Sequence, residues 1–269
     1  MSLSISGKTA IVTGAARGVG LAIARHFVDL GAKVMFADMD EAKLADEVGA
    51  EAAEEGNVRY FGGDLSQKLT LANLLSATVD AFERIDILVN ASRGIVTSDP
   101  LNPDDEGLEV MLKQNLMTSL KLSQMTAKRM IAQAEKEGHE EGPVGSIINI
   151  STLAARRTQP EFLAYSVASA ALDQATRSLA VALAPERIRV NGIALASVMS
   201  ASLQASLKDN PDWRGTITDA TPMRRIAPPS ELADVAQFLA SDGSGFVTGQ
   251  ILTVDGGRSL IDPAPVPAY

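Results

Sequence analysis

Short apolar stretches alternate along the chain with longer amphipathic ones. The apolar stretches are rich in β-branched residues and bounded by glycine or polar residues, so they are predicted as strands. Between them, apolar residues recur three or four positions apart, which is typical of helices packed on one face. The predicted strands lie at 9–13, 33–37, 58–62, 85–90, 146–150, 188–193 and 251–254. The predicted helices lie at about 18–30, 40–55, 67–83, 105–135, 160–184 and 230–240.

This alternation predicts the fold class. Strand, helix and strand in regular succession imply a parallel sheet with right-handed crossovers. Several of the strands are almost wholly apolar, as expected when helices cover both faces of the sheet. We therefore expect an α/β protein: one Rossmann-type domain over residues 1–269, with a doubly wound parallel sheet of seven strands and helices on both faces.

Three segments depart from the alternation. Residues 135–144 are charged and contain glycine, which predicts a solvated loop before the fifth strand. Residues 197–228 follow the sixth strand at its carboxyl end, where ligands bind in open α/β sheets. They are predicted to form a lid over the substrate, with a packed surface excursion as the alternative. The tail, residues 262–269, is expected to reach a neighbouring subunit or to hang free.

Composition excludes several classes of partner. The formal charge of −9 opposes binding to a nucleic-acid backbone. No run of about 18 apolar residues is present and no secretory signal is visible, so no membrane partner is expected and the cytoplasm is the expected location. With no cysteine and only His26 and His139 as imidazoles, no structural metal is expected.

A glycine-rich turn joins the first strand to the first helix. The sequence there is TGAARGVG, residues 13–20. Glycines let the backbone turn sharply and approach a pyrophosphate, whose charge is met by amide groups and by the positive end of the helix dipole. The turn therefore predicts a dinucleotide site. Its cofactor-binding residues are Gly14, Arg17, Gly18, Val19 and Gly20.

The end of the second strand indicates which dinucleotide is bound. Asp38 lies about 20 residues beyond the turn, where a carboxylate accepts hydrogen bonds from the adenosine ribose and repels a 2′-phosphate. This position favours NAD. Arg17 points weakly the other way, because a cation in the turn could reach a 2′-phosphate. NADP is therefore the less favoured alternative.

Further motifs accompany the turn along the chain. They are Asp64-Leu65 after the third strand, Asn90 at the end of the fourth, Asn115 in the long helix, Tyr165, and the sequence VDGG at 254–257. With the spacing TGxxxGxG, they resemble the short-chain dehydrogenase/reductase family from Gly7 to about Leu260. The chain most resembles the family's 3-oxoacyl-carrier-protein reductase and sugar or hydroxysteroid dehydrogenase branches. The resemblance implies hydride transfer between a nicotinamide cofactor and a small-molecule alcohol or carbonyl.

The resemblance also implies roles for individual side chains. Tyr165 would move the proton, and Thr152, or less favourably Ser151, would orient the carbonyl. Asn115 would bend its helix and bind a water of the proton relay. The two hydroxyl residues could instead simply end a strand. Asn115 could be a buried helical asparagine satisfied by the backbone alone.

The same resemblance implies further contacts and an oligomer. Most members of the family are dimers or tetramers paired through two long helices, here 105–135 and 160–184, so a homo-oligomer such as a homotetramer is expected. Asp64 is expected near the adenine. The further cofactor-binding candidates are Asp64, Leu65, Asn90, Ala91, Ser169, Val198 and Ser200.

Three departures from the family pattern fall on the nicotinamide half of the site. Ser169 stands where the family has a lysine four residues after the tyrosine, so no charge on that helix face favours the phenolate, and general-base activity near neutral pH would be poor. The turn at 90–94, Asn-Ala-Ser-Arg-Gly, replaces Asn-Asn-Ala-Gly, and Leu195-Ala196 replaces Pro-Gly. The adenosine and pyrophosphate half is intact.

Three hypotheses follow from this asymmetry. In the first, the chain is a working oxidoreductase in which Arg93 supplies the missing cation, although Arg93 could as easily face solvent. In the second, catalysis is slow and favours carbonyl reduction, because a neutral tyrosine can still donate its proton. In the third, the chain is a non-catalytic NAD-binding partner or sensor in a mixed oligomer with a catalytically complete sibling.

Overall fold

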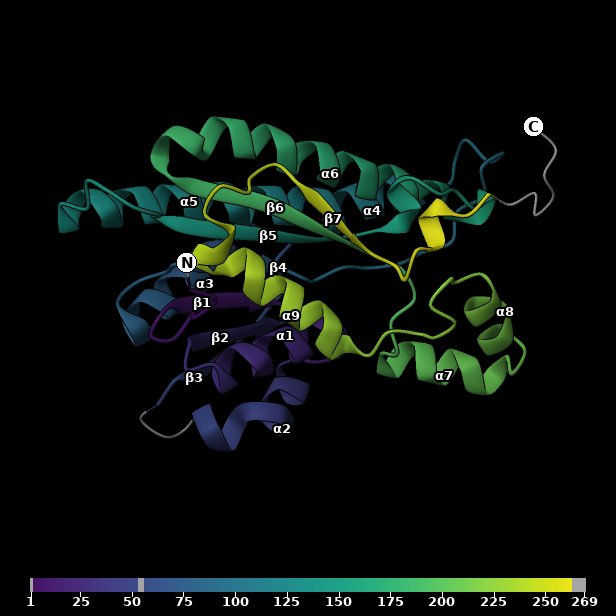
Figure 1. Cartoon of the computed structure of the whole chain (residues 1–269), viewed down its shortest axis with the longest axis horizontal. Helices are drawn as coiled ribbons and strands as arrows, with labels where there is room; N and C mark the ends of the chain where they lie inside the picture. Colours follow the sequence, from purple (N-terminus) through teal and green to yellow (C-terminus); the bar gives the residue numbers. More distant parts are fainter. Residues whose placement is uncertain (1, 53–55, 263–269) are drawn as a thin grey trace.

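Seven strands form one parallel sheet in the computed structural model, which describes residues 2–52 and 56–262. Their order across the sheet is β3-β2-β1-β4-β5-β6-β7 (Figure 1). The predicted doubly wound α/β fold is therefore confirmed. The strands are β1 Thr9–Thr13, β2 Lys33–Asp38, β3 Val58–Gly62, β4 Ile87–Asn90, β5 Gly145–Thr152, β6 Ile188–Leu195 and β7 Ile251–Val254.

Helices cover both faces of the sheet. Helices α1, α2 and α9 contribute apolar side chains to the core on one face, and α3, α5 and α6 contribute to the core on the other. Strand β1 shows why its residues are apolar throughout, because Val12 belongs to the first core and Ile11 to the second. The helices are α1 Gly18–Asp29, α2 Glu41–Ala52, α3 Lys68–Phe82, α4 Gly107–Met111, α5 Thr118–Glu137, α6 Leu163–Leu183, α7 Ala201–Asp209, α8 Trp213–Asp219 and α9 Pro229–Ala240.

Several predicted boundaries were wrong by a few residues. Strand β4 begins at Ile87, not at 85, and β5 and β6 extend two residues further because Ser151 and Thr152 pair with Ala194 and Leu195. Thr152 is thus the last residue of β5 and does not lie beyond it. The last three residues of the predicted helix at 40–55 lie outside the described residues. So do residues 263–269 of the tail.

The long helix predicted at 105–135 is in fact three consecutive segments. Between α4 and α5 lies a π-helical turn, η1, at Leu112–Met117. Helix α5 runs to Glu137 and ends at Gly138, which has a φ of 63°, so the charged loop before β5 begins three residues later than predicted. A π-turn carries one extra residue per turn, and such turns are frequent at functional sites.

Residues 197–228 contain no strand of the sheet, as predicted, but carry two helices. Helices α7 and α8 lie together at one end of the molecule (Figure 1). An isolated parallel bridge between Val198 and Ala227 closes the base of this segment. No helix within residues 2–52 and 56–262 has the length and apolar character needed to cross a membrane.

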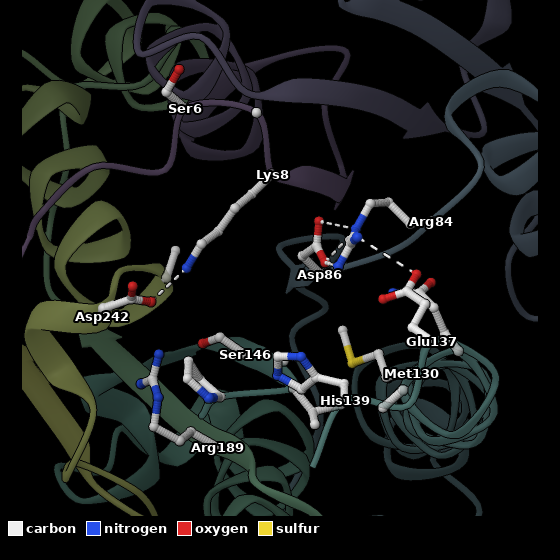
Figure 2. Close-up of a pocket in the computed structure, with 17 residues that line it drawn as sticks. Ser6, Lys8, Arg84, Asp86, Met130, Glu137, His139, Ser146, Arg189 and Asp242 are labelled. Atoms are coloured by element: carbon white, nitrogen blue, oxygen red, sulfur yellow. Dashed lines mark hydrogen bonds and ion pairs between the residues drawn. The ribbon is translucent and has the colours of Figure 1, made fainter. Parts of the chain in front are cut away.

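The amino-terminal edge of the sheet is held by buried charge. Asp86 accepts a hydrogen bond from the Thr9 amide at 2.8 Å, which ties the start of β1 to the start of β4. Arg84 donates to the same carboxylate from Nη2 at 2.8 Å. A pocket of about 420 Å³ opens at this edge, where Lys8 also pairs with Asp242 at 2.7 Å (Figure 2).

Replacing Asp86 by alanine is expected to lower the free energy of unfolding by about 1 to 3 kcal/mol, because the buried Thr9 amide loses its acceptor. Urea denaturation followed by circular dichroism measures the change. The matched control is Asp104→Ala at an exposed loop position, which should change stability by less than about 0.5 kcal/mol. Equal effects of the two substitutions would contradict this role for Asp86.

Candidate active site

The glycine-rich turn lies at the carboxyl end of β1 and cannot carry larger side chains. Gly14 and Gly18 have φ values of +66° and +62°, in the left-handed region that favours glycine. A Cβ on Gly14 would lie 2.8 Å from the carbonyl carbon of Ala91, and one on Gly20 only 2.2 Å from the Gly14 oxygen. The backbone therefore packs as closely as a pyrophosphate cradle requires, with Arg17 and Val19 in the same loop and first turn of α1.

Two carboxylates stand beside this turn. Asp38, the last residue of β2, accepts a hydrogen bond from the Ala16 amide at 3.1 Å. Asp40, which the sequence did not single out, is bonded to the guanidinium of Arg17. The charge of Arg17 is thus paired within the protein. Because Arg17 is paired, it is less available to bind a 2′-phosphate. Asp38 keeps unused lone pairs that could accept hydrogen bonds from a ribose.

The third strand leads into the predicted adenine position. The backbone and hydroxyl hydrogen bonds from Ser66, each 2.9 Å, hold the pKa of the exposed Asp64 carboxyl below its usual range. Leu65 is buried under it, in the same core as α3. An ionised acceptor is therefore fixed at this end of the site.

The turn after β4 is clamped at two points. The Thr13 hydroxyl accepts hydrogen bonds from the amides of Ala91 and Ser92, both at 3.1 Å. Two residues further on, the Asn115 amide group binds the Gly94 backbone twice, accepting from its N–H at 2.8 Å and donating to its carbonyl at 2.9 Å. Arg93 lies between these two fixed points.

The polar side chain that ends β4 is directed into the core. Asn90 donates to the Asn149 side chain at 2.8 Å and to Ser123 at 3.0 Å, and it is 3% exposed. These bonds join β4, β5 and α5 below the site. Only the backbone of Asn90 reaches the carboxyl edge of the sheet, beside Ala91.

Tyr165 lies near the start of α6 and is 5% exposed. Its hydroxyl accepts a hydrogen bond from Nη1 of Arg93 at 3.1 Å. Ser169 does not face the phenol in the same way, because its hydroxyl donates to the Tyr165 carbonyl at 2.7 Å. The predicted cation at position 93 and the phenol are therefore brought together, although they are 72 residues apart in the chain.

The two candidate hydroxyls differ in their surroundings. Both Ser151 and Thr152 line a small cavity with Tyr165 and Arg93. Thr152 accepts from the Ala154 amide at 3.3 Å, which leaves its own proton free to donate. Ser151 is buried, with no partner of normal hydrogen-bond geometry among the described residues.

Behind Ser151 lies a buried acid that the sequence did not single out, Asp173. Burial raises the pKa of this carboxyl, and the Ser151 hydroxyl and the Arg156 guanidinium, 3.9 Å away, offset part of that effect. Asp173 is two helical turns beyond Tyr165 on the same face of α6, and this spacing is the signal that would have found it.

The remaining candidates lie at the base of residues 197–228. Ser200 caps α7 by accepting from the Leu203 amide at 3.3 Å. A Cβ on Gly18 would lie 3.8 Å from the Cβ of Ser200, so this cap adjoins the glycine-rich turn. Val198, buried two residues earlier, forms the bridge to Ala227.

These features define a class of protein. A parallel sheet with a glycine cradle at the carboxyl end of β1 and carboxylates near the ends of β2 and β3 is typical of dinucleotide-binding proteins. A tyrosine hydroxyl and two further hydroxyls meet next to the cradle, at the ends of β4 and β5. Such a group can transfer a proton to or from an oxygen atom of a bound substrate.

Comparison with known proteins identifies the family. A family model described as Enoyl-(Acyl carrier protein) reductase matches residues 14–259. The 2,3-dihydroxy-2,3-dihydro-p-cumate dehydrogenase of Pseudomonas putida is 30% identical over 263 residues, which cover 97% of each chain. The chain belongs to the short-chain dehydrogenase/reductase family.

Two solved structures extend the comparison. A 7α-hydroxysteroid dehydrogenase complexed with NADH and 7-oxo glycochenodeoxycholic acid superposes with a TM-score of 0.85 at 29% identity, covering 95% of each chain. A gluconate 5-dehydrogenase from Burkholderia cenocepacia J2315, in complex with NADP and tartrate, has a TM-score of 0.84 at 28% identity and covers 97% of this chain and 98% of that one. The two differ in cofactor, so the likeness does not fix this chain's preference.

The chain is therefore an oxidoreductase that interconverts an alcohol and a carbonyl of a small molecule with a nicotinamide cofactor. The predicted class of enzyme is confirmed. The alternative of a non-catalytic partner subunit or sensor receives no support from relatives that are named as dehydrogenases.

Proposed function

We propose that the chain is an NAD-preferring dehydrogenase in which Tyr165 transfers the proton and Thr152 orients the substrate oxygen. The observation that carries this proposal is the buried Tyr165 hydroxyl in one cavity with Thr152, at the carboxyl ends of the strands beside the glycine cradle. Ser151 is the weaker candidate for the orienting role, because it faces Asp173.

The chain's own residues divide the reaction between them. The glycine-rich turn would hold the dinucleotide, and the bound cofactor would supply the hydride acceptor for alcohol oxidation or the hydride donor for carbonyl reduction. In carbonyl reduction, Tyr165 donates its phenolic proton to the oxygen that receives the electron pair of the C=O π bond. In alcohol oxidation, Tyr165 takes the proton back. Thr152 donates a hydrogen bond to the same oxygen and so fixes its position.

The preference for NAD is supported by charge at the ribose end of the site. Asp38 and Asp40 stand together after β2, and Arg17 is paired with Asp40. A 2′-phosphate would bring about two negative charges to this pair of carboxylates, with no unpaired cation in the turn to meet them.

Residues 197–228 are proposed to be a lid over the substrate. They join the cradle through Ser200 and border a pocket of about 450 Å³ at the ends of β6 and β7. Trp213 and Met223 are 50% and 58% exposed, which favours a partly hydrophobic substrate beneath this segment.

A homotetramer is proposed from two separate exposed apolar faces. One lies on α6, where Val167 and Val181 are 44% and 79% exposed. The other lies at the edge of the sheet that β7 forms. Phe246, a few residues before β7, is fully exposed. A twofold pairing through each face generates a closed set of four chains.

Replacing Tyr165 by phenylalanine is expected to lower kcat by about 1000-fold, because the proton donor is removed while the ring remains. The Kd for NADH, measured by fluorescence titration, should stay within about threefold. Tyr60→Phe, on β3, is the matched control and should keep wild-type turnover. Turnover by the Tyr165 variant at the wild-type rate would rule out its proposed role.

The double variant D38A/D40A is expected to raise the ratio of kcat/KM for NADPH over NADH by about 100-fold, because two carboxylates disappear and Arg17 is released from its pair. Steady-state kinetics with both cofactors measures the ratio. Asp46→Ala, at an exposed position on α2, is the control. An unchanged ratio would show that the carboxylates do not select NAD.

Charged substitutions are expected to split the proposed tetramer into dimers. Val181→Glu and Phe246→Glu each place a charge on one of the two proposed contact surfaces, and the double variant should be monomeric. Light scattering after size-exclusion chromatography gives the mass. A monomeric wild-type chain, or a tetramer that survives both changes, would refute the assignment of these faces.

A further inference from the structure

Ser169 supplies no charge to the Tyr165 phenol. The structure places a cation beside that phenol from the turn after β4. We propose that Arg93, on the turn after β4, is the catalytic cation that stabilises the Tyr165 phenolate in place of a charge carried by α6. This inference rests on the proposed function, in which Tyr165 transfers the proton. It goes beyond that function by naming the residue that makes the transfer effective.

The first support is direct contact in a buried setting. Nη1 of Arg93 donates to the Tyr165 hydroxyl oxygen at 3.1 Å, and Tyr165 is 5% exposed. A hydrogen bond from an ionised donor is stronger than a neutral one, and it is stronger still away from water. Because the guanidinium has no acceptor, it leaves the phenolic proton free to point at a substrate.

The second support is the lack of any other charged side chain in the lining of the cavity around the phenol, as far as the described residues go. Among the described residues that line the cavity around Tyr165, Arg93 is the one charged side chain. The nearest acid on α6 is Asp173, two turns away, with Arg156 at 3.9 Å from it. Apart from Tyr165, the other polar lining groups come from the turn after β4, η1, α5, β5 and α6 and are neutral: Ser92, Asn115, Ser119, Ser151, Thr152 and Ser169.

The third support is that the backbone on both sides of Arg93 is held. Thr13 fixes the amide of Ser92, and the Asn115 amide group binds both backbone groups of Gly94. A guanidinium on a fixed backbone loses less entropy when it engages the phenol. Thr13 and Asn115 therefore act as positioning residues for Arg93.

Little free volume remains beside the phenol. The cavity lined by Tyr165, Arg93 and Ser169 measures about 10 Å³, roughly the space for a single water. Ser169 is 4% exposed, so a long side chain at position 169 would have to displace its neighbours. We therefore expect a lysine at position 169 to fit better when Arg93 is shortened.

The proposed step balances with the hydride that a reduced nicotinamide cofactor would supply to the carbonyl carbon and with one proton from solvent per turnover. In carbonyl reduction the phenolic O–H bond breaks, its proton forms a bond to the substrate oxygen, and its electron pair stays on Tyr165 as phenolate. Arg93 donates to that oxygen throughout and keeps its own protons, since a guanidinium stays charged at all working pH values. Water later returns a proton to the phenolate.

The test moves the cation between its two places. Arg93→Ala and the bulkier neutral Arg93→Gln are each expected to lower kcat about 100-fold, with the Kd for NADH within about threefold. Arg93→Lys should keep part of the activity. In the double variant R93A/S169K, kcat should recover at least about tenfold over Arg93→Ala, whereas Ser169→Lys alone should gain nothing because Arg93 still lines the small cavity.

A second readout needs no turnover. The ultraviolet absorbance of tyrosinate is followed against pH in the cofactor-free protein, and subtraction of the Tyr165→Phe titration isolates Tyr165. At a fixed alkaline pH, the tyrosinate absorbance assigned to Tyr165 should be lower in Arg93→Gln than in the wild type, because the neutral side chain stabilises the phenolate less. Arg129→Ala, which removes an exposed arginine on α5, should leave the titration unchanged.

Several results would overturn the inference. One is wild-type kcat and titration in both neutral variants. Another is a raised substrate KM with kcat unchanged, which would make Arg93 a substrate-binding residue. A third is tighter NADH binding without Arg93, which would show that its side chain obstructs the nicotinamide. If Tyr165→Phe is inactive while the Arg93 variants are normal, this inference fails alone; an active Tyr165→Phe removes the proposed function itself.

Discussion

The active edge depends on one hydroxyl, that of Thr13 at the end of β1. It accepts hydrogen bonds from the backbone amides of Ala91 and Ser92 and so joins β1 to the turn after β4. The next residue, Gly14, packs directly on Ala91, where any Cβ would be 2.8 Å from the backbone. The pyrophosphate cradle and the turn that carries Arg93 are therefore one packed unit. Neither can shift without breaking the two hydrogen bonds to Thr13 or the close contact of Gly14 with Ala91.

The two ends of the candidate site in this acidic chain carry opposite local charge. Next to the glycine-rich turn, Arg17 and Asp40 are paired beside Asp38, which leaves a net negative charge at the end of β2. The tyrosine end has Arg93, whose cavity holds no carboxylate among the described residues. A formal charge of −9 is therefore no guide to the local field at the reacting atoms, which a few buried contacts determine.

The sequence predicts the fold well because the strands are buried on both faces and thus read as apolar runs. It fails where pairing, not hydrophobicity, sets an end: Ser151 and Thr152 are polar, yet they belong to β5 through their register with β6. The π-turn around Asn115 has no apolar signature of its own. At the site, the glycines and Tyr165 were evident, whereas Thr13 resembles any β-branched strand residue. Its role depends on β4 lying next to β1, which only the sheet order reveals.

A cation on the turn after β4 is positioned by a different part of the protein than a cation on α6 would be. A lysine four residues after Tyr165 would move with the phenol as part of one rigid helix. Arg93 instead is attached to backbone held by Thr13 and Asn115, next to the glycine-rich turn. Its distance to Tyr165 therefore depends on how the turn after β4 lies relative to α6, and not on one helix alone. Thr13 holds the backbone on one side of Arg93 and Asn115 holds it on the other, so both act on the Arg93–Tyr165 hydrogen bond without touching the phenol.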